Sequence, residues 1–276
     1  MPHFVNYNGK ILYEDMPIVN AGNRGLRYGD GIFETMKMVD ADIQLENYHF
    51  ERLFGALDLL RFQIPPHFTT AFLKEQILIL CSKNKLKKAA RIRLNIFRKN
   101  GGLYDLLDCS PDFVIEAWEL PENYFRLNEN GLTVDIYSEA KKSCDRFSTV
   151  KSNNYLPYAM GAFYAQENKF NDCLILNTHN RICDATIANV FWVHDQSIFT
   201  PPLTEGCIAG VMRRHLLDIL PKRGYTVQEK KMELSDLQQA DELFLTNAIS
   251  GIRWVKEARG KQFKNTLSTI MYPLHF

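Results

Sequence analysis

The segment that most restricts the fold is Arg91–Arg98, which reads RIRLNIFR. Its polar and apolar side chains alternate, with Arg91, Arg93 and Asn95 on one face and Ile92, Leu94 and Ile96 on the other. Successive side chains of a β-strand point to opposite faces of a sheet, so this pattern predicts a strand with one buried face. We expect Asp112–Trp118 to pair with it, across a loop that contains Gly101 and Gly102.

Two amphipathic helices are expected before this strand. Asn47 is a suitable N-cap for a helix that runs to about Phe62, and a second helix should cover Thr70–Ser82. In the first helix, apolar residues recur at intervals of three and four positions: Phe50, Leu53, Phe54, Leu57 and Leu60.

The chain of 276 residues exceeds the usual size of one hydrophobic core, and its 46% hydrophobic content can fill more than one. The proline and charges of Leu120–Arg126 suggest a boundary. We therefore predict an α/β (α+β) protein with a smaller N-terminal domain at 1–120, a linker at 121–126 and a larger domain at 127–276. In the latter we expect helices from about Asn153 and at Ile208–Leu220, and strands at LTVDIYS, Asp172–Leu176, Asn189–His194, Glu242–Thr246 and near Thr226 and Trp254.

Charge and cysteine usage exclude several classes of function. Lys and Arg total 33 against 32 Asp and Glu, so no basic excess favours nucleic acid or an anionic membrane. No segment approaches the ~18 consecutive apolar residues of a membrane span. The six cysteines form no CxxC pair and none has zinc-ligand spacing, which indicates reduced, buried thiols in a cytoplasmic protein with no metal. A small molecule is the expected partner.

Two residues could carry chemistry in the second domain. Lys151 lies where the irregular segment CDRFSTVK meets a helix, and a lysine amine can bind an aldehyde cofactor as a Schiff base. Asp184 follows a short strand and could pair with a protonated pyridine nitrogen. A lone lysine is in most cases a solvated surface charge, and a turn carboxylate is a common alternative for Asp184, so neither residue decides alone.

Two further segments suit a phosphate group. Gly206 and Gly210 lie at the turn into the helix of TPPLTEGCIAGVMR, and the N-terminus of a helix attracts anions. His49 and Arg52 are neighbours on one helix face, and the arginine fork matches phosphate oxygens. An ordinary turn and a surface arginine remain the simpler interpretations.

Together these segments resemble the class-IV (fold-type IV) family of pyridoxal-phosphate (PLP) enzymes. The resemblance covers nearly the whole chain and rests on seven segments in the family's order: RGLRYGDGIFETMKM, HFERL, RIRLNIFR with GGLY, VKSNNYL, NRICDATIANVFWV, TPPLTEGCIAGVMR and ELFLTNAISGIRWV. It implies a fold like that of D-amino acid aminotransferase, with pyridoxal 5'-phosphate as the cofactor.

The resemblance also implies roles for individual residues. Lys151 is similar to the Schiff-base lysine, Arg52 to the phosphate-binding arginine, and Tyr155 to a residue near the ring. Ile208 and Ala209 resemble residues at the start of a helix whose N–H groups bind the cofactor phosphate. Ala248 resembles a residue of a second turn that binds the same phosphate. Asp184 stands where the family usually has glutamate, and is one methylene shorter.

Within the family, the motifs look most like those of 4-amino-4-deoxychorismate lyases, which release pyruvate and form 4-aminobenzoate for folate synthesis. Thr35 would face the substrate, and Tyr28, Arg93 and Arg98 would bind it, with Arg253 a further carboxylate candidate. The alternatives are a class-IV aminotransferase acting on branched-chain or D-amino acids, a PLP-binding protein without turnover, and an unrelated α/β binding domain. The resemblance further implies a homodimer, since family members complete the active site with a partner loop.

Overall fold

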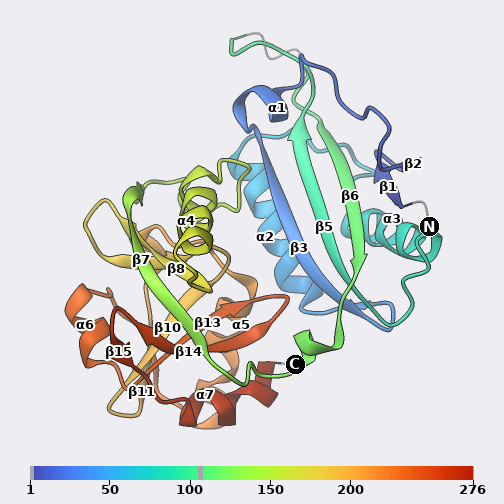
Figure 1. Ribbon diagram of the computed structural model, residues 1–276. Coiled ribbons are helices and arrows are strands. Elements are labelled where there is room, and N and C mark those ends of the chain that lie inside the picture. Colours follow the sequence, from blue (N-terminus) through green and yellow to red (C-terminus); the bar gives the residue numbers. More distant parts are fainter. Residues whose placement is uncertain (1–2, 105–107, 276) are drawn as a thin grey trace. The chain divides into compact units, whose positions relative to one another are not determined.

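The computed structural model describes residues 3–104 and 108–275 and shows a mixed α/β protein, as predicted (Figure 1). The chain divides into two compact units. The first contains Met1–Glu122 together with Lys151–Asn154, and the second contains Asn123–Val150 and Tyr155–Phe276. The sequence placed Lys151 in the second domain, whereas in the structure its short segment belongs to the first unit. That the two units fold as separate domains stays a prediction.

An antiparallel sheet forms the first unit, and its described strands follow the order β2-β1-β6-β5-β3-β4. The predicted pairing of two strands is confirmed, since Leu94 of β5 lies opposite Ile115 of β6. Ile92, Leu94 and Ile96 are fully buried, as their alternation required. The strands are β1 (Phe4–Tyr7), β2 (Lys10–Tyr13), β3 (Gly31–Val39), β4 (Asp42–Ile43), β5 (Ala89–Arg98) and β6 (Pro111–Glu119).

Two helices, α2 (Glu46–Leu59) and α3 (Thr70–Lys83), pack on this sheet, and the short α1 (Arg24–Tyr28) precedes β3 (Figure 1). Helix α3 begins where predicted, and the Thr69 hydroxyl accepts a hydrogen bond from Phe72 N at 3.2 Å. The predicted N-cap Asn47 is wrong, because α2 already begins at Glu46. Its N-cap is Leu45, which has a left-handed backbone and makes no side-chain cap.

The segment that carries Lys151 pairs with the beginning of β3. Phe33 N donates to Lys151 O at 3.0 Å, and Asn153 N donates to Gly31 O at 2.9 Å. The Asn153 side chain also donates to Asn95 Oδ1 on β5 at 3.0 Å. Because both backbone and side chain are bound, the position of the Lys151 backbone is set by this sheet.

A larger mixed sheet forms the second unit, with the described strands in the order β12-β11-β10-β13-β14-β7-β8-β9 and β15 paired to β14. The predicted strands are all present. The two predicted helices are present but begin three residues later than expected, α4 at Leu156 and α5 at Val211. The elements are β7 (Leu132–Lys142), α4 (Leu156–Glu167), β8 (Asp172–Asn177), β9 (Ile182–Ala185), β10 (Asn189–His194), β11 (Ser197–Thr200), α5 (Val211–Ile219), β12 (Val227–Glu229), α6 (Leu234–Gln239), β13 (Glu242–Asn247), β14 (Gly251–Ala258), β15 (Lys261–Gln262) and α7 (Thr266–Met271).

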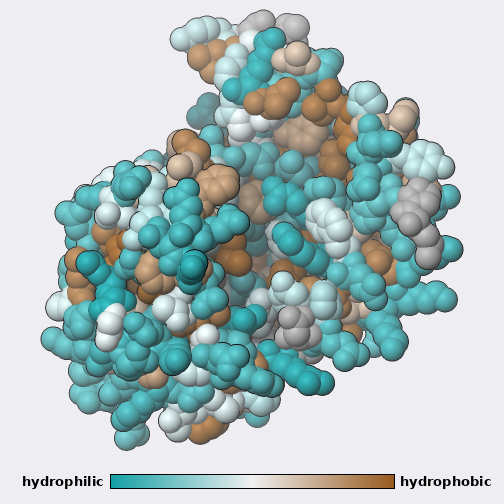
Figure 2. Space-filling model, viewed as in Figure 1, coloured by the Kyte–Doolittle hydropathy of each residue, from teal (hydrophilic) through white to brown (hydrophobic). Residues whose placement is uncertain are grey.

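The face of the molecule shown in Figure 2 is mostly hydrophilic, with smaller hydrophobic patches between charged and polar side chains. Among the described residues, no helix combines the length and the apolar character that crossing a membrane requires. The nearly equal numbers of basic and acidic residues in the sequence agree with this surface of mixed polarity.

Replacing Gly31 with alanine should destabilise the first unit and disturb the lysine segment. A Cβ at this position would overlap Ile96 O and lie 2.6 Å from Asn153 Nδ2. We expect Gly31→Ala to lower the free energy of unfolding by ~1 to 3 kcal/mol, measured by urea denaturation. The matched control is Gly55→Ala in α2, where a Cβ meets nothing within 4 Å and alanine should stabilise the helix by ~0.5 to 1 kcal/mol. Equal stabilities for the two variants would contradict this prediction.

Candidate active site

The Lys151 side chain lies against the ring of Phe33 in the first unit. Its Nζ is 4.2 Å from the ring centroid, and the guanidinium carbon of Arg93 is 4.1 Å from the same centroid. The register of β3 and β5 places Thr35 directly opposite Arg93, so both side chains are on the Phe33 face of the sheet. The structure thus brings together four residues, of which the sequence predicted Lys151, Thr35 and Arg93.

Arg52 takes part in a buried cluster with Glu34 and His49. Arg52 Nε donates to Glu34 Oε1 at 2.8 Å and Nη2 to Oε2 at 2.6 Å, while His49 Nδ1 lies 2.7 Å from Oε2. Burial raises the pKa of Glu34, but the Arg52 charge and the His49 hydrogen bond outweigh it and bring the value to about 2. Glu34 is therefore a permanent anion that fixes the direction of the Arg52 guanidinium.

Arg98 lies on the opposite face of β5 from Arg93, because the two differ by five positions and side chains alternate between faces along a strand. It is buried, its Nη1 donates to Asp30 Oδ1 at 2.7 Å, and Nη2 donates to Leu60 O. Arg24 binds the other oxygen of Asp30 and stacks over the ring of Tyr28, which is more than one-third exposed. The structure therefore does not bring Arg98 or Tyr28 to the Phe33 face, and Arg98 is used to hold Asp30.

Asp184 is the most enclosed of the predicted site residues, at 1% exposure. Its carboxylate accepts three hydrogen bonds of 2.8 Å each, from the Tyr158 hydroxyl and Ile208 N to Oδ2 and from Asn189 Nδ2 to Oδ1. Burial raises the pKa of Asp184 to about 6, although Lys142 and the three hydrogen bonds act in the other direction. Among the residues that the structure describes, no cation is in ion-pair contact with Asp184, although the charge of Lys142 acts on its carboxylate.

The predicted phosphate-binding residues Ile208 and Ala209 already donate their N–H groups, to Asp184 and to Thr149 O. Both precede the helix, which begins at Val211. Among the residues 3–104 and 108–275, no acceptor binds the N–H groups of Val211 and Met212. The first N–H groups of α5 that could bind a phosphate are thus those of Val211 and Met212, whereas the sequence suggested a start at Ile208.

Of the remaining predicted residues of the second unit, Tyr155 is the N-cap of α4 and Ala248 lies in a turn. Tyr155 donates its hydroxyl to Thr186 O at 3.0 Å and stacks on Tyr158 with centroids 4.4 Å apart. Ala248 lies in a turn closed by Asn247 Oδ1, which accepts hydrogen bonds from two following N–H groups. Nothing in these contacts assigns Ala248 a ligand.

The residues of these clusters that were missed in the sequence include Glu34, Tyr158 and Asn189. Glu34 had a detectable signal, since an acid between Ile32 and Met36 occupies an apolar face and requires a buried partner. Tyr158 and Asn189 had none, because tyrosine and asparagine at these positions fit an ordinary helix and strand.

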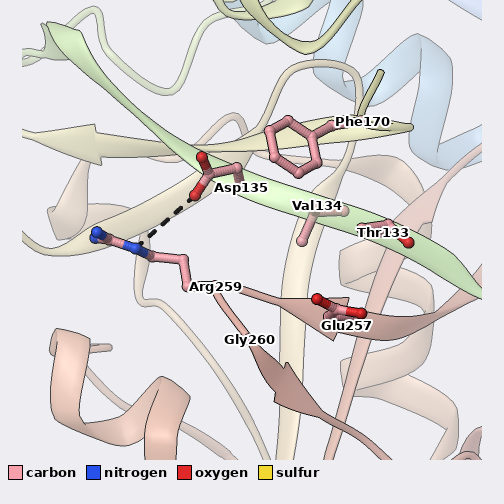
Figure 3. A pocket seen from close by; sticks show the side chains of 7 residues that line it. All are labelled: Thr133, Val134, Asp135, Phe170, Glu257, Arg259 and Gly260. Atoms are coloured by element: carbon pink, nitrogen blue, oxygen red, sulfur yellow. Dashed lines mark ion pairs between the residues drawn. The ribbon is translucent and has the colours of Figure 1, made fainter. Parts of the chain in front are cut away.

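A pocket of about 390 Å³ in the second unit is lined by none of the predicted site residues (Figure 3). Arg259 Nε lies 3.8 Å from Asp135 Oδ1 across it, and Tyr164 donates its hydroxyl to Asp135 Oδ2. Asp135 and Arg259 are therefore already paired with each other, while Glu257 accepts a hydrogen bond from Gln262 Nε2 at 2.6 Å. Its lining residues are Thr133, Val134, Asp135, Phe170, Glu257, Arg259 and Gly260.

Comparison with known proteins identifies the family. The family model described as amino-transferase class IV matches residues 31–258. This chain belongs to the class-IV aminotransferase family. The aminodeoxychorismate lyase of Vibrio harveyi is 30% identical over 85% of each chain. A putative branched-chain-amino-acid aminotransferase of Methanocaldococcus jannaschii is 29% identical over 94% of this chain and 88% of its own.

A solved structure supports the fold of this family member. The branched-chain aminotransferase of Thermoproteus uzoniensis superposes with a TM-score of 0.88 and 20% identity, covering 100% of this chain and 94% of the other. The predicted family, fold class and PLP-dependent enzyme class are confirmed. Identity this low supports the fold and no finer statement.

The stability of the cofactor-free class-IV protein should depend on Asp184 ionisation. Its folded-state pKa of about 6 exceeds the ordinary 3.8, so its stabilising contribution is complete below pH 3.8 and is lost as pH rises through 6. Between pH 5 and pH 8 we expect the free energy of unfolding to fall by about 1 to 2 kcal/mol relative to Asp184→Asn, which cannot ionise. Urea denaturation at several pH values measures this difference, and parallel pH profiles for the two proteins would refute it.

Proposed function

We propose that this chain is a pyridoxal-phosphate-dependent 4-amino-4-deoxychorismate lyase, which produces pyruvate and 4-aminobenzoate for folate synthesis. The observation that carries this proposal is the placement of Lys151 and Arg93 against one Phe33 ring, with Thr35 beside Arg93. A reactive amine thus lies near a guanidinium that suits a substrate carboxylate. The similarity to the Vibrio harveyi lyase supports the same assignment.

The residues present fit pyridoxal 5'-phosphate in their chemistry. Asp184 is a buried carboxylate whose direct contacts are all neutral donors, and a protonated ring nitrogen would give it a cation in contact. The N–H groups of Val211 and Met212 at the start of α5 suit a phosphate, and the guanidinium of Arg52, which Glu34 holds, would add positive charge. Lys151 would hold the cofactor covalently through Nζ, with Tyr155 near the ring and Ala248 in a second phosphate-binding turn.

When bound, pyridoxal phosphate supplies a ring that accepts the electrons left behind by a departing proton. The substrate amine would first replace Lys151 Nζ on the cofactor, and the freed Nζ would then remove the proton from the substrate carbon that bears nitrogen. Loss of this proton would let the C–O bond to the enolpyruvyl group break. The same Nζ returns the proton to the departing group, which leaves as pyruvate, while the remaining ring becomes aromatic. Arg93 orients the substrate through its carboxylate, and Asp184 keeps its negative charge throughout.

A class-IV aminotransferase is the second candidate, supported by the similarity to the Methanocaldococcus jannaschii protein. It would use the same lysine, carboxylate and phosphate contacts. The two reactions differ in where Lys151 returns the proton, and an aminotransferase must also bind a second substrate in the same place. A PLP-binding protein without turnover would keep the cofactor contacts and release neither product.

We also propose a cytoplasmic homodimer. Six cysteines without a disulfide are consistent with a reducing compartment. Light scattering at micromolar concentration should give about twice the chain mass of 32.0 kDa. A monomer that retains full turnover would contradict the dimer.

Product analysis tests the lyase assignment directly. Purified protein given aminodeoxychorismate should release pyruvate and 4-aminobenzoate in equal amounts, while amino transfer from branched-chain or D-amino acids to 2-oxoglutarate stays much slower. Borohydride reduction and peptide mapping should place the pyridoxyl group on Lys151, and Lys151→Ala should lose at least about a thousandfold in rate. Rapid amino transfer without 4-aminobenzoate would establish the aminotransferase instead, and a label on another lysine would exclude Lys151.

Arg93→Gln should weaken use of the lyase substrate because it removes a charged partner of the carboxylate. We expect kcat/KM to fall by roughly 10 to 100-fold, with the cofactor spectrum unchanged. The matched control is Arg91→Gln, an exposed arginine on the same strand and face that stacks on Trp118. Equal losses in both variants would show that Arg93 has no specific role.

A further inference from the structure

The Asp184 carboxylate has one acceptor position left. A carboxylate offers about four acceptor positions, two on each oxygen. Oδ2 accepts from the Tyr158 hydroxyl and from Ile208 N, and Oδ1 accepts only from Asn189 Nδ2. Among the described residues Asp184 makes no other hydrogen bond, so the remaining position belongs to Oδ1.

The donors around Asp184 are themselves fixed. Asn189 Nδ2 also donates to Ile208 O at 2.8 Å, so both of its N–H bonds are used. Tyr158 is 4% exposed, its ring stacks on Tyr155, and Lys142 Nζ lies 5.1 Å from its centroid. The Tyr158 hydroxyl therefore occupies one defined place.

We propose that Tyr158 is a positioning residue of the cofactor site, whose hydroxyl holds the Asp184 carboxylate so that Oδ1 accepts the hydrogen bond of the protonated ring nitrogen. This inference rests on the cofactor assignment of the proposed function. The side chain of Asp184 has a single methylene, so it has little reach to adjust its own direction. The Tyr158 hydroxyl is the second donor on Oδ2, beside Ile208 N, and prevents the short carboxylate from turning away.

Tyr158 also favours the charged form of Asp184. Its hydrogen bond lowers the pKa of the carboxyl group, against burial, which raises it. The other titratable groups whose charges act on Asp184 are Lys142, which lowers its pKa, and the buried thiols of Cys183 and Cys207. The pKa values of both thiols are raised by burial, so these neighbours stay neutral and Lys142 is the only cation of this set.

The experiment compares Tyr158→Phe, which removes only the hydroxyl, with Tyr164→Phe. Tyr164 is on the same helix and also donates to a carboxylate, that of Asp135 in the pocket of Figure 3, which is outside this cluster. Two quantities are measured: the dissociation constant of pyridoxal phosphate by equilibrium dialysis, and the Asp184 pKa in cofactor-free protein by carbon-13 NMR of labelled aspartate.

In Tyr158→Phe we expect cofactor binding to weaken about tenfold and the Asp184 pKa to rise by about one unit. Tyr164→Phe should match the wild type in both measurements. Values for Tyr158→Phe within twofold of the wild-type dissociation constant, with an unmoved pKa, would overturn the proposal. If the wild-type protein binds no pyridoxal phosphate, both the Tyr158 proposal and the cofactor assignment are overturned. If it binds the cofactor but forms no 4-aminobenzoate, only the lyase assignment is contradicted.

If Tyr158→Phe does not fold, 3-fluorotyrosine introduced at position 158 gives a second test that nearly preserves the shape. Its hydroxyl is more acidic and hence a stronger donor, so the Asp184 pKa should fall and cofactor binding should tighten. An Asp184 pKa that is unchanged by fluorination would overturn the proposal.

Discussion

The pairing of the lysine segment with β3 is the interaction on which the candidate site depends. Two backbone hydrogen bonds join Lys151 and Asn153 to residues 33 and 31, and the Asn153 side chain reaches β5. These contacts place the Lys151 amine against Phe33, beside Arg93 and Thr35. A lysine carried on an unpaired loop would have many side-chain and backbone conformations, and ordering it at the moment of reaction would cost conformational entropy.

Two of the buried carboxylates, Glu34 and Asp184, have opposite electrostatic states. Glu34 is bound by Arg52 and lies beside His49, so its pKa falls to about 2 and its charge is neutralised locally. Asp184 has only neutral donors in contact, and its pKa rises to about 6. Glu34 thus forms an ion pair that orients Arg52, whereas Asp184 has no cation in contact and would be stabilised by a bound one.

The periodicity of the sequence predicted the helices and strands more accurately than it predicted the contacts between them. The alternation in β5 fixed its buried face, and the apolar spacing located α2 and α3 to within a few residues. It could not predict that Lys151–Asn154 joins the first unit, because this depends on hydrogen bonds between residues over a hundred positions apart. The start of α5 was misplaced because Ile208 and Ala209 continue the apolar pattern while their N–H groups bind elsewhere. The sequence suggested Arg98 as a substrate ligand. Its contact with Asp30 could not be foreseen, because it depends on the tertiary structure.

The close approach of Gly210 to Asn189 also limits how this site can change during evolution. A Cβ at position 210 would overlap Asn189 Oδ1, and the Asn189 amide is one of the three groups that hold Asp184. Any larger residue at 210 therefore demands a smaller or displaced one at 189, and the effects of changing both positions should be strongly non-additive. Among relatives of this chain, positions 189 and 210 are consequently expected to vary together, with glycine retained wherever asparagine is.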